Sequence, residues 1–251
     1  MSVYDGPKIT TNGLVLALDV GNRLSYVSGS TTWNDISNNA NNGTLINGPT
    51  FNTEFNGSLV FDGVDDYVNL VTSSLYQFTN TDPFTISAWI NANNIGEYNT
   101  ILAYSLGVSD FRGYYLQLVP TASIALAGQR TNSFIFDYFE GTTPSSNWKG
   151  IVGDSNSITF NSWIMITATS ATGNNASGMT VYQNASIVPF QIRRNSSPNS
   201  INYTGVPLTI GSRGGIQQFK GNIASAQIYN RALSAQEVLQ NYNATKTRFG
   251  L

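Results

Sequence analysis

The sequence contains no cysteine and no histidine. Without cysteine, the chain can form neither disulfide bonds nor thiolate metal sites, and it has no thiol nucleophile. Without histidine, it cannot build a Ser-His-Asp triad, and a bound metal would need oxygen ligands, for which calcium is the obvious candidate. These two absences exclude several classes of enzyme and metal site.

Charge is also scarce, at 10% of residues, and the formal net charge is -2. The 12 basic residues are spread along the chain, so nucleic acid is not expected as a partner. No run of 18 apolar residues occurs, and the first ten residues lack the basic and apolar parts of a secretory signal. We therefore expect no membrane span, no membrane partner and synthesis in a cytoplasm without export.

Short apolar or alternating runs separated by turn residues recur along the chain, which is typical of an all-β sandwich or barrel. Residues 14–18 are continuously apolar, as in a strand covered on both faces, whereas residues 84–91 alternate as in a half-buried strand. Residues 141–157 are the most loop-like stretch. Further strands are predicted at residues 58–61, 67–70, 101–106, 114–119, 123–127, 134–139, 163–169, 179–183, 208–210 and 222–229.

One short C-terminal helix is predicted by Ser234 and Glu237, whose spacing lets each side chain cap an exposed amide of the other. Val238, Leu239 and Tyr242 then supply an apolar stripe. The helix should cover residues 235–244 and lie against the sandwich. We expect an N-terminal arm of residues 1–12 and a single domain of residues 13–251.

Several motifs occur in a fixed order that resembles the concanavalin A-like lectin/glucanase, laminin-G-like domain family. They are GLVLALD at 13–19, TTWND at 31–35, NNGTL at 41–45, FDGVDDYV at 61–68, FTISAWI at 84–90, FKGNI at 219–223 and IYNRALS at 228–234, followed by Glu237. The resemblance covers nearly the whole chain, is weakest at about residues 107–160, and implies an antiparallel jelly-roll sandwich. Asn184 and Ala185 stand where the family usually has an Asn-Gly hairpin, which leaves that turn type open.

Single domains with these opening and closing motifs resemble virion proteins of tailed bacteriophages. The resemblance implies a virion structural, decoration or fibre-associated protein, made in the host cytoplasm and located on the particle. Its expected partners are neighbouring virion proteins, further copies of itself and host surface polysaccharide. Two alternatives remain open: a dedicated lectin or adhesin, and a glycan-active hydrolase.

The hydrolase is the least favoured alternative. Glucanases that resemble this domain use acidic residues that alternate on one strand, because alternate side chains share a face. The glutamates of this sequence form no such pattern; they are Glu54, Glu97, Glu140 and Glu237. We therefore expect no enzymatic activity, no catalytic residue and no required cofactor.

Asp62, Asp65 and Asp66, with Asn69 nearby, are the candidate calcium ligands, since carboxylate and amide oxygens suit that ion. The alternative, which turn chemistry favours, is structural. Asp62 and Gly63 form a natural tight turn in which the aspartates cap backbone amides.

Trp148 is the main candidate for carbohydrate binding, because it lies in the loop-like stretch and an aromatic face can stack on a sugar ring. Tyr114, Tyr115 and Arg112 are the residues that could join it. The alternative for Trp148 is packing, in which one large side chain anchors a long loop. The alternative for the two tyrosines is an ordinary aromatic pair within a strand.

Overall fold

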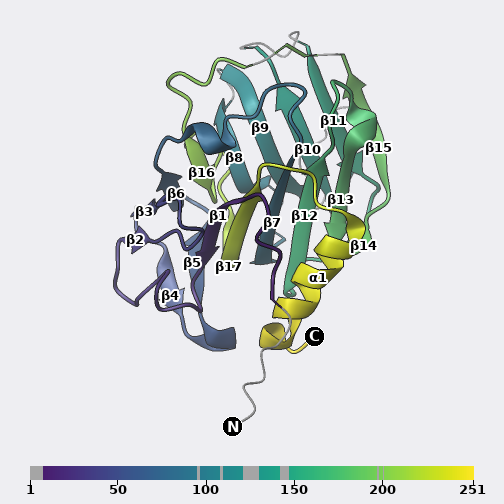
Figure 1. Cartoon of the computed structure of the whole chain (residues 1–251). Helices are drawn as coiled ribbons and strands as arrows, with labels where there is room; N and C mark the ends of the chain where they lie inside the picture. The colour runs from purple at the N-terminus through teal and green to yellow at the C-terminus, as the bar shows by residue number, and fades with distance from the viewer. Residues whose placement is uncertain are drawn as a thin grey trace.

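The computed structural model describes residues 8–94, 97–107, 110–120, 130–141, 147–196, 198–199 and 201–251. These residues form two antiparallel sheets and one short C-terminal helix, the predicted sandwich (Figure 1). The first sheet has eight strands, in the order β14-β13-β12-β7-β17-β5-β4 with β1 also paired to β17, and the second has nine, in the order β15-β11-β10-β9-β8-β16-β6-β3-β2. The predicted strand at residues 123–127 lies outside the described residues.

The eight-stranded sheet consists of β1 (Leu14–Asp19), β4 (Thr50–Asn52), β5 (Ser58–Asp62), β7 (Phe84–Ala92), β12 (Ile164–Ser170), β13 (Met179–Gln183), β14 (Ser186–Ile187) and β17 (Lys220–Tyr229). The nine-stranded sheet consists of β2 (Thr32–Trp33), β3 (Gly43–Ile46), β6 (Tyr67–Leu70), β8 (Asn99–Gly107), β9 (Asp110–Val119), β10 (Ser133–Phe139), β11 (Trp148–Gly153), β15 (Phe190–Asn195) and β16 (Leu208–Ile210). The helices are α1 (Ala235–Thr245) and the short 3-10 turns η1 (Glu54–Asn56), η2 (Ser74–Tyr76), η3 (Ala176–Gly178) and η4 (Lys246–Phe249).

The main core lies between the two sheets and is rich in aromatic side chains. Phe84 of β7 lies near its centre, with ring centroids 4.9 Å from Tyr114 and 5.7 Å from Phe136 of the opposite sheet. The apolar positions of residues 84–91 face this core, as the alternation predicted. Burial of such large rings removes much apolar surface from water and holds the two sheets together.

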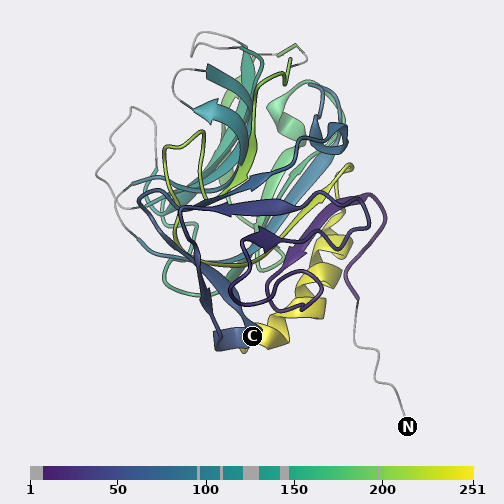
Figure 2. The same ribbon diagram turned by 90° about the vertical axis from the view of Figure 1, so that its left-hand side faces the viewer.

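The outer face of β7 is also buried, so the prediction of a half-buried strand was wrong. Helix α1 and η4 cover the eight-stranded sheet on the side away from the main core (Figure 2). Trp89 stacks on Phe249 with ring centroids 4.2 Å apart, and its indole nitrogen donates to the Thr245 hydroxyl at 2.8 Å. Polar Ser87 is satisfied there by the hydroxyl of Thr167 at 2.8 Å. The alternation was correct, but it does not reveal that a helix covers the polar side.

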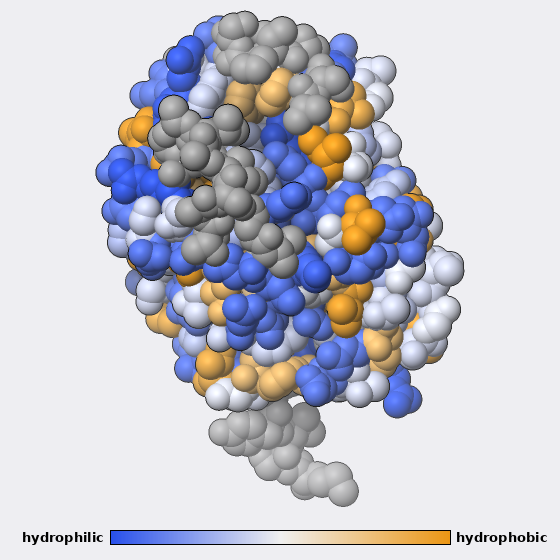
Figure 3. All heavy atoms as spheres, turned by 180° about the vertical axis from the view of Figure 1, so that it is seen from behind, coloured by the Kyte–Doolittle hydropathy of each residue, from blue (hydrophilic) through white to orange (hydrophobic). Residues whose placement is uncertain are grey.

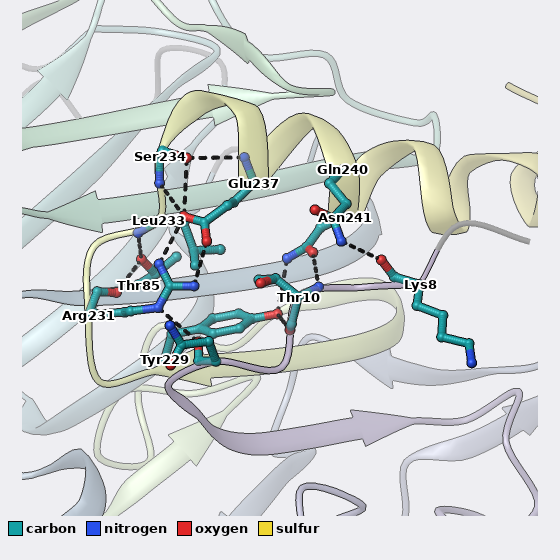
Figure 4. A network of polar contacts seen from close by, with 11 residues as sticks. Lys8, Thr10, Thr85, Tyr229, Arg231, Leu233, Ser234, Glu237, Gln240 and Asn241 are labelled. Carbon is teal, nitrogen blue, oxygen red and sulfur yellow. Dashed lines mark hydrogen bonds and ion pairs between the residues drawn. The ribbon is translucent and has the colours of Figure 1, made fainter.

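Helix α1 carries the predicted capping box at Ser234 and Glu237. It also holds the described part of the N-terminal arm (Figure 4). Asn241 accepts from the Thr10 amide at 2.8 Å, and Gln240 donates to the Lys8 carbonyl at 2.8 Å. Residues 8–12 are therefore fixed by the chain's own C-terminal helix.

Six of the described strands lie where the sequence did not indicate them, and the two longest, β11 and β15, pair with each other. Trp148–Gly153 forms β11 within the stretch predicted to be a loop, and Phe190–Asn195 forms β15 beside it.

Viewed from the side opposite α1, the surface is mainly hydrophilic with small hydrophobic areas (Figure 3). Within the described ranges, no helix has the length and apolar character needed to cross a membrane.

Candidate functional site

An open cavity of about 680 Å³ lies where β6 ends and β16 begins, beside two adjacent interior strands of the nine-stranded sheet. Its walls come from residues 69–79, in and after β6, and from residues 201–207, which lead into β16. The polar part of the lining consists of Asn69, Thr72, Gln77, Thr79, Asn202 and Thr204. The apolar part includes Phe78, Ile201, Val206 and Pro207. No charged side chain is among the described residues that line it.

The wall formed by residues 201–207 is held firmly against the sheet. The ring of Tyr203 stacks on that of Tyr104 with centroids 4.4 Å apart, and its hydroxyl donates to the Phe78 carbonyl at 2.8 Å. Gln77 donates from its side-chain amide to the Tyr104 hydroxyl at 3.0 Å. The two walls are thus joined through Tyr104, and the cavity is formed before any ligand arrives.

Arg112, one of the predicted carbohydrate-binding residues, supports this cavity from behind. Its guanidinium forms a bidentate ion pair with Asp110, at 2.6 Å for the shortest contact, and donates to the Asn202 carbonyl at 2.8 Å. The hydrogen bond from Arg112 holds the pKa of Asp110 below its usual value. Because both charges are used in this pair, Arg112 positions the wall that Asn202 belongs to and is not itself part of the lining.

The two predicted tyrosines lie on opposite faces of β9. Tyr114 is fully buried in the main core, where its hydroxyl donates to the Tyr76 carbonyl at 2.9 Å. Tyr115 points outward and donates to Asp137 at 2.8 Å. Burial raises the pKa of both phenols. No single ligand surface contains both side chains, because adjacent residues of a strand face opposite ways.

Trp148 lies on the same outer face as Tyr115, away from the cavity. Its ring stacks on Phe139 with centroids 4.7 Å apart, and the guanidinium of Arg193 lies 5.1 Å from its centroid. The structure therefore brings Trp148 and Tyr115 together on one face and separates them from Tyr114 and Arg112. The contacts of Trp148 agree with the packing alternative and leave the ring only partly exposed.

The predicted calcium ligands are only partly brought together. Asp62, Asp65 and Asp66 place one carboxylate oxygen each within 4.8 Å of one another, whereas Asn69 lines the cavity. These oxygens suit calcium in kind. Asp62 also accepts from the Val64 amide at 2.7 Å, and Asp66 accepts from the Asp62 amide at 3.0 Å, so both carboxylates close the turn. Burial, followed by its two aspartate neighbours, raises the pKa of Asp66.

The sequence did not reveal the cavity. Its two walls lie about 130 residues apart in the chain, and they carry ordinary turn residues in no recognisable spacing. Asn and Thr residues are common throughout this sequence, so those in the lining gave no distinct signal.

A family model described as "Concanavalin A-like lectin/glucanases superfamily" matches residues 62–239. A search of curated proteins found no match. Among solved structures, the binding domain of Paraclostridial Mosquitocidal Protein 1 is 19% identical with a TM-score of 0.64, and the match covers 92% of this chain and 52% of that one.

Two further solved structures contain a sugar according to their descriptions. The botulinum neurotoxin serotype D ligand binding domain in complex with N-acetylneuraminic acid is 14% identical, has a TM-score of 0.64, and is matched over 92% of this chain and 51% of that one. The binding domain of botulinum neurotoxin DC in complex with SialylT is 15% identical, with a TM-score of 0.63 and coverage of 94% and 52%. At these identities the likeness shows the fold alone, and the chain spans about half the length of these structures.

Proposed function

Because this chain belongs to the concanavalin A-like lectin/glucanases superfamily, we propose that it is a carbohydrate-binding protein without catalytic activity, and that its cavity beside β6 and β16 holds a neutral saccharide. The observation that carries this proposal is the uncharged lining. A saccharide offers hydroxyl groups and apolar C–H faces, and the cavity offers amides, hydroxyls and an apolar wall. A phosphate would favour a site with basic side chains, and a metal ion or an organic cation would favour one with carboxylates. The described lining has neither kind of side chain.

The absence of catalysis is supported by the same lining. Glycoside hydrolysis requires two carboxyl groups that flank the scissile bond, one as acid and one as base or nucleophile. No Asp or Glu is among the described residues of the cavity wall. A saccharide held there would contact amide and hydroxyl side chains, which do not titrate near neutral pH and so cannot act as a general acid or base.

The similar solved structures support the class of ligand but not its identity. Two of them are described with sialic-acid-containing ligands, which are ligands of those proteins. Because this chain matches only about half of each structure, the position of the sugar in those structures does not locate a sugar site in this chain. The uncharged cavity favours a neutral sugar here.

We further propose that the protein acts on the surface of a virion, as a structural, decoration or fibre-associated subunit that contacts neighbouring virion proteins and host polysaccharide. This setting is supported by the order of motifs from residues 13–19 to 228–234, which resembles virion proteins. Quantitative analysis of purified particles tests it. The protein should be present in a fixed, high copy number, and its absence from particles would contradict the setting while leaving the cavity proposal intact.

The cavity proposal is tested by glycan-array screening of the whole chain, followed by calorimetry with the neutral glycans that bind. Thr204 is exposed at the cavity wall, so Thr204→Trp should obstruct it and weaken binding about tenfold or more. Thr53 is an exposed threonine outside the cavity whose side chain caps nothing, and Thr53→Trp is the matched control. Equal affinities for the two variants, or no neutral glycan bound at all, would refute the proposal.

A further inference from the structure

The outer face of the nine-stranded sheet carries a second group of aromatic side chains, separate from the cavity. Tyr115, Phe139 and Trp148 point outward from three adjacent strands, β9, β10 and β11. Ring centroids are 6.1 Å apart for Tyr115 and Phe139, and 5.6 Å apart for Phe111 and Phe139. We call these four residues the aromatic strip. Phe111 and Trp148 are its partly exposed members.

Three arginine side chains lie on the aromatic strip, and they come from two different elements. Arg213, in the turn that follows β16, lies 3.8 Å from the centroid of the Tyr115 ring. Arg193 and Arg194, both on β15, lie 5.1 and 6.0 Å from the Trp148 centroid. Each distance is within the range of a cation–π interaction. Positive charge thus gathers at both ends of one apolar surface.

Negative charge on this face is smaller. Among the described residues, the buried carboxylate that faces the strip is Asp137, which accepts from Tyr115 and Arg193. Arg213 is 3% exposed, forms no ion pair with a described residue, and has one guanidinium nitrogen, Nη2, without a hydrogen-bond partner. Asp137 attracts Arg213 electrostatically without a direct ion pair, and the same carboxylate is already ion-paired with Arg193. One buried carboxylate thus faces two guanidinium groups, and an approaching anion would offset part of the free-energy cost of burying the second.

The other charged groups near the strip do not cancel this excess. Asp110 and Arg112 neutralise each other. Glu140, at the end of β10, accepts from the backbone amides of Asn147 and Asn199, which fix its carboxylate without removing its charge. The three arginines Arg193, Arg194 and Arg213 still outnumber the two carboxylates Asp137 and Glu140, which leaves a smaller positive excess. Since the whole chain carries a net charge of -2, attraction of a polyanion would have to come from this local excess and not from overall charge.

We propose that the aromatic strip binds the carboxylate or sulfate groups of an acidic polysaccharide, at a second site distinct from the neutral cavity. Arg194 is exposed and forms no ion pair with a described residue, so its guanidinium group contacts the anionic groups, whereas Arg193 is half-buried and ion-paired with Asp137. The exposed parts of Trp148 and Phe111 contact the sugar C–H faces. The buried charge of Arg213 adds attraction from beneath. This inference goes beyond the cavity proposal, and neither depends on the other.

Calorimetric titration of the whole chain tests the site with four probes: oligogalacturonate, a heparin-derived sulfated oligosaccharide, a neutral dextran oligosaccharide and a single-stranded oligonucleotide. At least one acidic saccharide should bind more tightly than dextran and the oligonucleotide, and added salt should weaken it. Arg194→Gln should lower its affinity about fivefold, equivalent to roughly 1 kcal/mol. Arg194 is exposed, and a thermal melt would verify that the variant folds.

Arg23→Gln is the matched control, since Arg23 is exposed in the loop after β1 and the variant changes the net charge equally. It should keep the affinity for the acidic saccharide within about twofold. Equal losses for the two variants, no binding of either acidic probe, or an oligonucleotide bound as tightly as the saccharide would overturn the proposal. Thr204→Trp should leave acidic binding unchanged. If that variant abolished it, the ligand would lie in the cavity and the strip would be ruled out.

Discussion

Arg231 and Glu237 form a bidentate ion pair, with 2.8 Å between Nη1 and Oε2 and 2.6 Å between Nη2 and Oε1 (Figure 4). Glu237 simultaneously accepts from the Ser234 amide at 2.9 Å, and Arg231 donates from Nε to the Asn12 carbonyl at 2.8 Å. One pair of side chains therefore joins the start of α1, the end of β17 and the N-terminal segment.

Substitution of Glu237 should destabilise the protein in a pH-dependent way. The hydrogen bond from Arg231, followed by that from Ser234, lowers the pKa of Glu237 to about 2 from an ordinary value of 4.5. Since the pKa of Glu237 is lower in the folded state than in the unfolded chain, its ionised carboxylate stabilises the fold. This contribution to the free energy of unfolding is fully present above pH 4.5 and is lost as pH falls toward about 2. Glu237→Gln should cost about 1 kcal/mol at pH 7 and much less near pH 2, measured by urea unfolding.

The exposed glutamate Glu54 provides the control for this prediction. Glu54→Gln should change the free energy of unfolding by less than about 0.5 kcal/mol, as is usual for a surface substitution. A cost for Glu237→Gln that is the same at pH 7 and near pH 2 would show that the carboxylate charge does not contribute to the cap.

Ala185 should be replaceable by glycine with a gain in stability. Asn184 and Ala185 have φ angles of 51° and 64°, so this hairpin has positive φ at both central positions although the sequence lacks Asn-Gly. Alanine is strained there because its Cβ approaches the following carbonyl oxygen. Ala185→Gly should raise the free energy of unfolding by about 0.5–1 kcal/mol in a denaturant titration. A loss of stability would mean that the methyl contact of Ala185 with the cluster beneath α1 outweighs the strain.

The fold was largely predictable from local patterns. Apolar alternation located the central strands such as β7, and the spacing of Ser234 and Glu237 located α1. β11 and β15 were missed because isolated short runs with Gly, Asn and Arg residues have weak strand propensity, and only pairing with β10 and with each other makes them strands. Tertiary pairing, not local sequence, determines these two strands at one end of the nine-stranded sheet.

The candidate sites were much less predictable. The two-residue period of a strand places Tyr114 and Tyr115 on opposite faces of the sheet. The sequence alone does not show which of the two faces packs against the core. The cavity depends on how residues 201–207 fold back against residues 69–79, a contact over long sequence separation. Trp148 was placed in a loop, and its contacts with Phe139 and Arg193 arise only because three strands pair beneath them.

The acidic turn at residues 62–66 should act as a structural turn and not as a calcium site. Asp62 accepts from the Val64 amide at 2.7 Å and from the Asp65 amide at 3.4 Å, so Asp62→Ala should cost about 1 kcal/mol through the lost turn hydrogen bonds. Millimolar calcium should leave the melting temperature unchanged within about 1 °C, because only a ligand that binds the folded state raises it. A rise of several degrees that Asp62→Ala abolishes would instead establish a calcium site.

Lys149 should make stability rise with pH in the alkaline range. Its ammonium group is buried between the sheets, donating to the carbonyls of Asn80 at 2.8 Å and Gly173 at 2.9 Å, and burial lowers its pKa to about 8 from 10.5. Between these two values the unfolded chain binds more protons than the folded one, so this lysine contributes stability that increases as pH rises. The upper bound of the increase is about 3 kcal/mol.

The buried tyrosines oppose this trend, because burial raises the pKa of phenols such as Tyr114 and favours unfolding as the unfolded chain ionises. The difference between the wild type and Lys149→Met isolates the lysine, since both share the tyrosines. Urea unfolding at several pH values should show the free energy of the wild type rising relative to Lys149→Met from about pH 8 to pH 10.5. Lys149→Arg should also lack the rise, because arginine stays protonated throughout. A difference that is constant or falls across this range would show that the two carbonyl hydrogen bonds keep the lysine charged despite its burial.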